Sequence, residues 1–276
     1  MPTLLYPPAR PQSIGEVLDT AFRIFRVTLL GCLPFSVLAS VASQLPYVYA
    51  ILSGRPPPVL GDLDRLWWGL NLLGMIFWLA LVSVIILRQA AGASGIRLAA
   101  REGTVAALRK LPALLGMILG VLAVCAVCAV PLVFLPRTLL PTAIAVVLVP
   151  LTWLGVAVSC AAFAVLIGNK GPLASIRHSV HLVRGNWWRT ATIYSVAVVM
   201  LLVFYILATL LAGMVLPFTG VDDLALLTAI STVIGGAIST VGTPFYTAVG
   251  LALYGDLESR RQGSDLERRI AGATAG

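Results

Sequence analysis

Residues 66–87 read LWWGLNLLGMIFWLALVSVIIL, a stretch of 22 residues without one charged side chain. An α-helix rises about 1.5 Å per residue and the hydrocarbon layer of a bilayer is about 30 Å thick, so a helix of this length crosses a membrane once. Five further uncharged stretches, each of at least 22 residues, occur along the 276-residue chain. The sequence therefore predicts six membrane crossings.

The composition supports a membrane protein and excludes a water-soluble globular domain. Hydrophobic residues make up 59% of the chain and charged residues 11%, with a mean hydropathy of +0.98, whereas soluble domains carry about 25% charged residues. The uncharged stretches lack the two-residue alternation of barrel strands, and only helices or closed barrels satisfy the backbone in lipid. We therefore predict an all-α integral membrane protein with six transmembrane helices near 27–50, 66–87, 111–135, 139–167, 188–216 and 224–254.

The basic residues determine the predicted orientation. If the N-terminus is cytoplasmic, sixteen of the nineteen Lys and Arg residues fall on the inner side, and the outer loops hold only Arg55, Arg65 and Arg137. The positive-inside rule then places both the N- and C-termini in the cytoplasm. This asymmetry also accounts for the isoelectric point of 9.8, because a basic inner surface favours insertion and contact with anionic lipid headgroups. No nucleic-acid partner is expected.

Three stretches on the predicted inner side have the pattern of short amphipathic helices in the membrane interface: residues 13–26, 103–110 and 171–185. In the first, Ser13 and Glu16 have capping-box spacing, and Asp19 precedes Arg23 by four residues. The chain then divides into a cytoplasmic segment with an interfacial helix (1–26), a six-helix transmembrane domain (27–255) and a charged cytoplasmic tail (256–276). In the tail, Asp256 precedes Arg260 by four residues, and Gly263 is expected to form a hinge.

The third amphipathic stretch contains the candidate binding site. Pro172 near its start and Gly185 near its end are typical of a short helix, on which Arg177, His181 and Arg184 share one face. Three basic side chains in this arrangement form a candidate lipid-headgroup site, where they would bind a phosphate. The alternative interpretation is that these groups only solvate and anchor the helix beside the membrane.

No residue pattern predicts catalysis, a cofactor or a metal. His178 and His181, the two histidines of the chain, lack the His-Glu-x-x-His spacing of zinc enzymes. Cys125 and Cys128 have the spacing of a redox motif, but they lie in an apolar stretch where thiols stay protonated and unreactive. We therefore expect no catalytic, cofactor-binding or metal-binding residues.

Three motifs at the predicted cytoplasmic helix ends resemble a known family: residues 13–19 (SIGEVLD), residues 171–179 (GPLASIRHS) followed by Trp187 and Trp188, and residues 254–257 (YGDL) followed by Arg260. The family is the bacterial membrane domain found beside glycerophosphoryl diester phosphodiesterases, with its stand-alone relatives of unknown function. The resemblance implies a multi-pass protein of the bacterial inner (cytoplasmic) membrane. Since the chain stops about twenty residues after its last predicted helix, we expect the phosphodiesterase catalytic domain to be absent and the protein not to be an enzyme.

Two classes of function remain open from the sequence. The first is a non-catalytic membrane protein that binds lipids or protein partners and acts in envelope maintenance. The second is a passive or lipid-type transporter whose pathway is lined by proline-broken helices, with prolines at Pro34, Pro46, Pro131, Pro150, Pro217 and Pro244. Ion-coupled transport is disfavoured because the uncharged stretches hold no Asp, Glu, Lys, Arg or His. An enzyme that acts on lipid headgroups at the Arg177, His181 and Arg184 face is a weaker third hypothesis.

Overall fold

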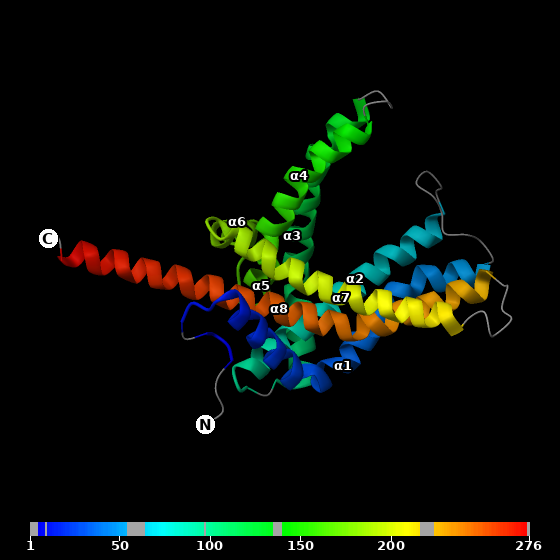
Figure 1. Cartoon of the computed structure of the whole chain (residues 1–276), viewed down its shortest axis with the longest axis horizontal. Coiled ribbons are helices and arrows are strands. Elements are labelled where there is room, and N and C mark those ends of the chain that lie inside the picture. Colours follow the sequence, from blue (N-terminus) through cyan, green and yellow to red (C-terminus); the bar gives the residue numbers. More distant parts are fainter. Residues whose placement is uncertain are drawn as a thin grey trace.

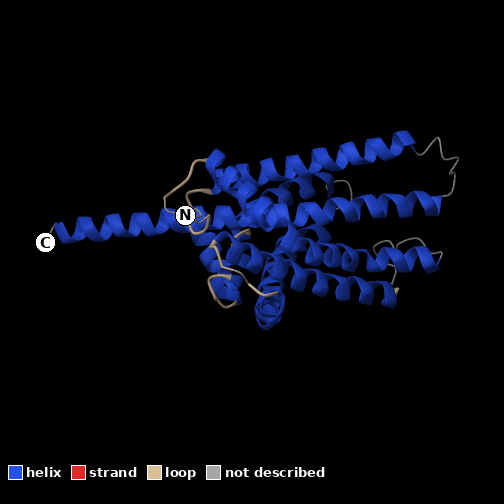
Figure 2. Ribbon diagram, turned by 90° about the horizontal axis from the view of Figure 1, so that it is seen from below, coloured by secondary structure: helices blue, strands red, loops and turns tan. Residues whose placement is uncertain are grey.

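The computed structural model describes residues 5–8, 10–53, 64–96, 98–134, 140–215 and 224–274. Within these ranges the chain forms eight helices and no strand (Figure 1): α1 (Ile14–Ser53), α2 (Arg65–Ala93), α3 (Ala100–Phe134), α4 (Leu140–Val158), α5 (Ala161–Leu166), α6 (Pro172–Val183), α7 (Trp187–Val215) and α8 (Leu224–Thr274). α3 and α4 diverge from α7 and α8 in Figure 1, and the C-terminal part of α8 projects beyond the other helices in both Figure 1 and Figure 2.

The predicted number of helices able to span a membrane is confirmed. In the described part of the chain, six helical spans are long and apolar enough to cross a membrane: Ile14–Ala50, Arg65–Ala93, Ala100–Val130, Val146–Leu166, Trp187–Leu211 and Thr232–Arg261. The chain is therefore an all-helical, multi-pass membrane protein. Several spans are longer than the uncharged stretches because the helices continue past the bounding charges, as α2 does past Arg88.

Two of the three predicted interfacial helices are not separate helices. Residues 14–26 form the first turns of the 40-residue α1, and residues 103–110 lie inside α3. In α1 no glycine or proline lies between residues 16 and 30 to end the helix, and Ala21 and Ile24 are fully buried in the core. The predicted first stretch is therefore continuous with the first crossing.

The local contacts predicted for the start of α1 are confirmed. The backbone N of Ser13 donates to Glu16 Oε2 at 2.6 Å, and the backbone N of Glu16 donates to Ser13 Oγ at 3.3 Å. Arg23 Nη2 lies 2.9 Å from Asp19 Oδ2. The two Ser13–Glu16 bonds satisfy backbone donors that would otherwise lack partners at the start of the helix.

α6 is the one predicted amphipathic stretch that stands as a short helix of its own. Pro172 is its first residue, and Gly185 follows its end with φ of +89°, a conformation that glycine adopts without strain. Two glycines of α3 let it pack closely, because a Cβ on Gly116 or Gly120 would lie 3.2 Å or 3.3 Å from the nearest atom of α6. These glycines therefore form a close contact between α3 and α6.

The predicted hinge at Gly263 is wrong. α8 continues without a break from Leu224 to Thr274 and contains this glycine in its interior. One glycine in a helix costs only about 1 kcal/mol relative to alanine, and no proline follows it. The tail is therefore a continuation of the last crossing.

The predicted helix at 139–167 is interrupted between α4 and α5. Ser179 of α6 supplies the physical reason, because its Oγ accepts from the backbone N of Cys160 at 3.1 Å and donates to the carbonyl of Ala157 at 2.7 Å. A side chain from another helix thus satisfies the backbone groups at the break. Sequence periodicity carries no signal of such a contact.

α1 packs along α2 and α8, and hydrogen bonds at regular spacing join it to α8. Three side chains at every fourth position of α1 donate to backbone carbonyls of α8: Ser36 Oγ to Thr240 O (2.6 Å), Ser40 Oγ to Gly236 O (2.8 Å) and Gln44 Nε2 to Thr232 O (3.3 Å). Pro244 has no N–H to donate to Thr240, so Ser36 supplies the missing donor. Side chains of α1 are therefore bonded directly to the backbone of α8.

Replacing Ser36 and Ser40 by alanine is expected to lower the free energy of unfolding by about 1 kcal/mol, since hydrogen bonds between membrane helices contribute about 0.6 kcal/mol each. Ser43→Ala is the matched control, because Ser43 Oγ donates within α1, to Ser40 O at 2.7 Å. Titration of mixed micelles with dodecyl sulfate, followed by circular dichroism, measures both variants. Equal stability of the double variant and the control would contradict the contribution of these bonds.

Candidate functional site

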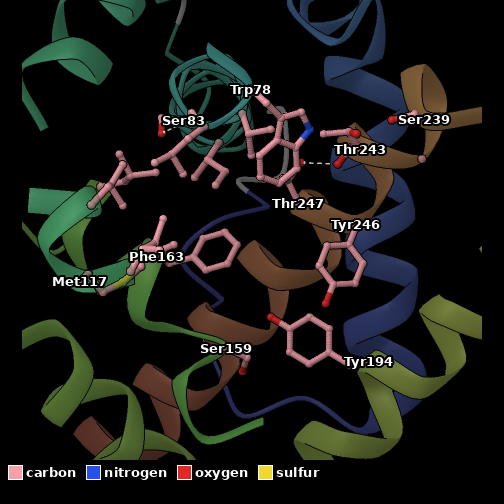
Figure 3. Close-up of a pocket in the computed structure, with 18 of the residues that line it drawn as sticks. Trp78, Ser83, Met117, Ser159, Phe163, Tyr194, Ser239, Thr243, Tyr246 and Thr247 are labelled. Atoms are coloured by element: carbon pink, nitrogen blue, oxygen red, sulfur yellow. Dashed lines mark hydrogen bonds between the residues drawn. The ribbon is translucent and has the colours of Figure 1, made fainter. Parts of the chain in front are cut away.

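A cavity of about 550 Å³ lies among α2, α3, α4, α5, α7 and α8 (Figure 3). Lining residues recur at every fourth position of three helices: Trp78, Val82 and Ile86 on α2, Leu114 and Ile118 on α3, and Ile238, Gly242 and Tyr246 on α8. One face of each helix therefore forms a wall. Ligand sites in proteins have volumes of roughly 300–1,000 Å³, so this space can hold a ligand.

The cavity walls are apolar and uncharged. No Asp, Glu, Lys, Arg or His is among the residues that line it in the described part of the chain. Three lining hydroxyls are bonded to the backbone of their own helices: Ser83 Oγ to Leu79 O (2.7 Å), Ser159 Oγ to Val156 O (2.8 Å) and Thr247 Oγ1 to Thr243 O (2.9 Å). The surface that remains suits a hydrocarbon ligand, because it presents apolar contacts and few free hydrogen-bonding groups.

Aromatic residues connect the cavity with the outer surface of the bundle. Tyr194 and Tyr246 lie side by side in Figure 3, with ring centroids 5.4 Å apart. Tyr194 is buried, whereas Tyr246 is 41% exposed and Trp78, on α2, is 36% exposed. The cavity therefore reaches the surface that faces lipid within the candidate membrane spans.

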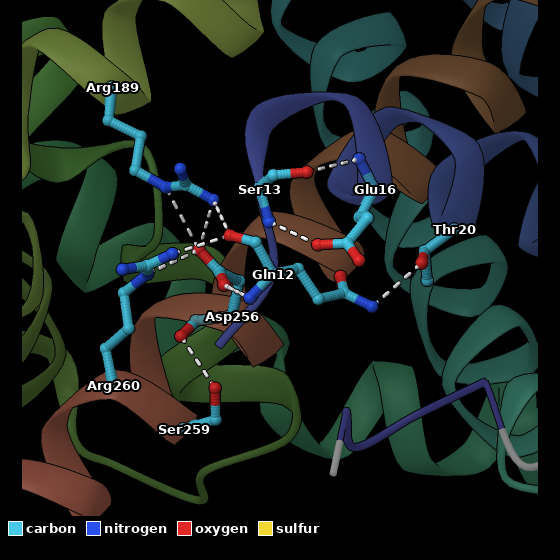
Figure 4. Close-up of polar contacts among 8 residues, drawn as sticks. All are labelled: Gln12, Ser13, Glu16, Thr20, Arg189, Asp256, Ser259 and Arg260. Atoms are coloured by element: carbon cyan, nitrogen blue, oxygen red, sulfur yellow. Dashed lines mark hydrogen bonds and ion pairs between the residues drawn. The ribbon is translucent and has the colours of Figure 1, made fainter. Parts of the chain in front are cut away.

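A second group of polar residues surrounds the buried carboxylate of Asp256 (Figure 4). Arg189 Nη2 and Arg260 Nε each lie 3.0 Å from Asp256 Oδ2, and the backbone N of Gln12 donates to Oδ1 at 2.7 Å. Both arginines also donate to the carbonyl of Gln12 at 2.5 Å. The carboxylate is satisfied by these groups and joins the N-terminal segment to α7 and α8, so we assign this cluster a structural role.

The sequence predicted half of this cluster. The spacing of Asp256 and Arg260 indicated their ion pair, which is confirmed. Arg189 lies 67 residues before Asp256, and nothing in the local pattern pointed to it.

The three residues of the predicted headgroup site are all exposed: Arg177 and His181 on α6, and Arg184 directly after it. His181 is in contact with α8, where the Arg261 guanidinium donates to its carbonyl and touches its ring. Arg184 lines a groove of about 390 Å³ together with Trp153 and Trp187. The structure thus adds Arg261 to this basic face, and binding of a headgroup there stays a prediction.

His178, the other histidine of the chain, has a carboxylate neighbour that its local sequence did not reveal. Its Nε2 lies 3.4 Å from Glu258 Oε1, which also accepts from Tyr254 at 2.7 Å. Burial lowers the pKa of the His178 imidazole, and the nearby Lys170 acts in the same direction. Among the residues that the structure describes, no cluster of His, Cys, Asp and Glu is arranged to hold a metal ion.

The residues that line the apolar cavity were not predicted as a site. Their four-residue spacing was visible in the sequence, but the same spacing occurs on helix faces that contact lipid or pack in a core. Only the arrangement of the helices in space separates these possibilities.

A protein-family model matches most of the chain. A family model described as a domain of unknown function, DUF7847, matches residues 69–256, about two thirds of the chain. No curated protein and no solved structure matches the chain. The resemblance to the membrane domain beside glycerophosphoryl diester phosphodiesterases is not tested by this match and stays a prediction.

Replacing Asp256 by asparagine is expected to lower the free energy of unfolding by about 3 kcal/mol, because breaking a buried ion pair leaves uncompensated charge on its partners. Asp19→Asn is the matched control, since its pair with Arg23 is exposed and exposed pairs contribute little. Thermal unfolding in detergent, read by size-exclusion chromatography after heating, compares the two. Loss of stability no greater than that of the control would show that the cluster does not hold the helices together.

Proposed function

The chain belongs to the DUF7847 family, which carries no assigned activity, and we propose that it is a non-catalytic membrane protein that binds a lipid chain in the cavity among α2, α3, α4, α5, α7 and α8. The observation that carries the proposal is an uncharged space of about 550 Å³ inside the membrane spans. A bilayer surrounds these spans with hydrocarbon chains, so the ligand that matches the walls is also the one at highest local concentration.

The cavity chemistry favours binding over catalysis. Hydrolysis or group transfer requires a nucleophile beside a base, or a charged group that stabilises the transition state. The lining instead consists mainly of apolar side chains, and the hydroxyls of Ser83, Ser159 and Thr247 are bonded to backbone carbonyls. A hydrocarbon chain needs none of these catalytic groups.

The cellular setting of the proposal comes from the sequence. The basic residues favour an orientation with both termini in the cytoplasm, and the family resemblance favours the bacterial inner membrane and a role in envelope maintenance. The projecting end of α8 (Figure 2) offers a segment on which a protein partner could dock. Binding of lipid is the part of the proposal that rests on the structure.

A lipid-type transporter is the second candidate, and the same cavity supports it. Transport of a lipid requires a path for its polar headgroup across the bilayer. Around Pro244, which lies inside the continuous helix α8, Gln89 Nε2 donates to Pro244 O at 2.7 Å and Ser36 donates to Thr240 O. Protein side chains therefore satisfy the backbone at this proline, which favours stable binding over a hydrated path.

Filling the cavity tests the proposal. Gly155 of α4 lines the cavity, and a Cβ added there meets no atom within 4 Å, so Gly155→Leu adds a side chain at the cavity wall at a position with room for its first carbon. We expect photolabelling of cavity residues such as Met117 and Phe163 by a phospholipid with a diazirine on its acyl chain to fall severalfold. Mass spectrometry of peptides locates the labels.

Gly213→Leu is the control for this experiment. A Cβ on Gly213 also meets no atom within 4 Å, and this glycine of α7 is exposed outside the cavity. Its labelling pattern is expected to match that of the unaltered protein. If Gly155→Leu left cavity labelling unchanged, no acyl chain would occupy the cavity. Fast movement of a fluorescent phospholipid between leaflets of reconstituted vesicles, lost in Gly155→Leu, would favour the transporter instead.

A further inference from the structure

Arg88 of α2 lies in a second cavity, of about 320 Å³. The other lining residues are Val27, Thr28, Gly31 and Cys32 of α1, Gly92 of α2, and Ile96 and Leu98 after α2. Arg88 follows Val82 by six residues, which places it on a different face of α2 from the apolar cavity. The two cavities are therefore separate, and the cavity at Arg88 is independent of the proposed lipid-chain site.

The guanidinium of Arg88 has unused donors. Nη1 donates to the carbonyl of Leu98 at 3.3 Å, and the guanidinium carbon lies 5.3 Å from the ring centroid of Phe35. Nε is buried and has no hydrogen-bond partner. No carboxylate forms an ion pair with Arg88 in the described part of the chain, in contrast to the shared pairing of Arg189 and Arg260 with Asp256.

Small residues make the space around this charge. A Cβ on Gly31 would lie 3.2 Å from Arg88 Nη2, and a Cβ on Gly92 would lie 2.8 Å from Thr28 Cγ2. Either side chain would fill the cavity or displace the guanidinium. Without them, the planar guanidinium of Arg88 borders the cavity with N–H donors that remain unused.

The charge of Arg88 lies at a boundary between apolar and polar surroundings. Arg88 directly follows the uncharged stretch 66–87, so it lies at the end of the hydrocarbon-crossing part of α2. Beside the cavity, Val27 is 67% exposed, Leu30 82% and Ile96 63%. An apolar surface that surrounds one cation matches an amphiphile with an anionic group.

We propose that the cavity at Arg88 binds a phosphate group, with the guanidinium donating hydrogen bonds to two of its oxygens. Arginine matches phosphate geometry in this bidentate manner. A phospholipid headgroup and a free phosphate share this chemistry, and the exposed apolar side chains beside the cavity would contact the acyl chains of the former. The site is distinct from the basic face of α6.

Native mass spectrometry of the full chain in detergent tests the site with phosphatidylglycerol, phosphatidylcholine and inorganic phosphate as probes. Arg88→Gln is expected to weaken binding of the first phosphatidylglycerol molecule about tenfold, the usual effect of losing one charge-assisted interaction. Arg23→Gln is the matched control, because it removes the same charge from an exposed pair with Asp19. Equal effects of the two variants would overturn the proposal.

Competition separates the two sources of phosphate. If excess inorganic phosphate displaces phosphatidylglycerol from the unaltered chain but not from Arg88→Gln, the site recognises the phosphate group alone. If only phosphatidylglycerol binds, and Arg88→Gln abolishes its advantage over phosphatidylcholine, the site requires the lipid. Both results support a phosphate site at Arg88, whereas an unchanged preference for phosphatidylglycerol in Arg88→Gln excludes it.

Arg88→Lys keeps the test decisive if Arg88→Gln does not fold. Lysine retains the charge but lacks the planar fork, so phosphatidylglycerol binding is expected to weaken severalfold while the protein remains monodisperse. Affinity equal to that of the unaltered chain would contradict bidentate binding. Photolabelling of the apolar cavity by the diazirine lipid is expected to stay unchanged, which distinguishes failure at this site from failure of the proposed function.

Discussion

The requirement that every backbone polar group in a bilayer finds a partner shapes this bundle more than any other constraint. Pro244 removes the donor that would bond the carbonyl of Thr240, and Ser36 of α1 replaces it. At the end of α4, Ser179 of α6 performs the same task for Cys160 and Ala157. In both places an irregularity in one helix is stabilised by a hydroxyl from another, so these irregularities join particular helices as neighbours.

These bonds explain why the cavity exists where it does. α1 is joined to α8, and α6 is joined to the break between α4 and α5, while α3 and α4 diverge from α7 and α8 (Figure 1). Helices that are fixed to different partners cannot all close on one another. The space left among them is lined by the apolar faces of α2, α3 and α8, which membrane insertion had already made suitable for hydrocarbon.

The sequence predicted what depends on local pattern and missed what depends on tertiary contact. Charge spacing was enough for six crossings, and residue spacing was enough for the Ser13–Glu16 cap and the Asp256–Arg260 pair. The interruption before Ala161 depends on Ser179, which comes from another helix. The role of Arg189 depends on Gln12, which lies far away in the sequence. The cavity was missed for the same reason, since a helix face has the same residue pattern whether it contacts lipid, protein or a ligand.

The arginines of the described structure differ in what compensates their charge. Arg189 and Arg260 share Asp256, and Arg23 has Asp19. Arg88 has a carbonyl and an aromatic ring, both weaker partners for a cation than a carboxylate. A cation at the edge of the hydrocarbon is costly without an anion, and at that depth the abundant anion is the phosphate of a lipid. The bilayer requires backbone groups to pair within the protein, and its lipids can therefore also supply the anion that Arg88 lacks.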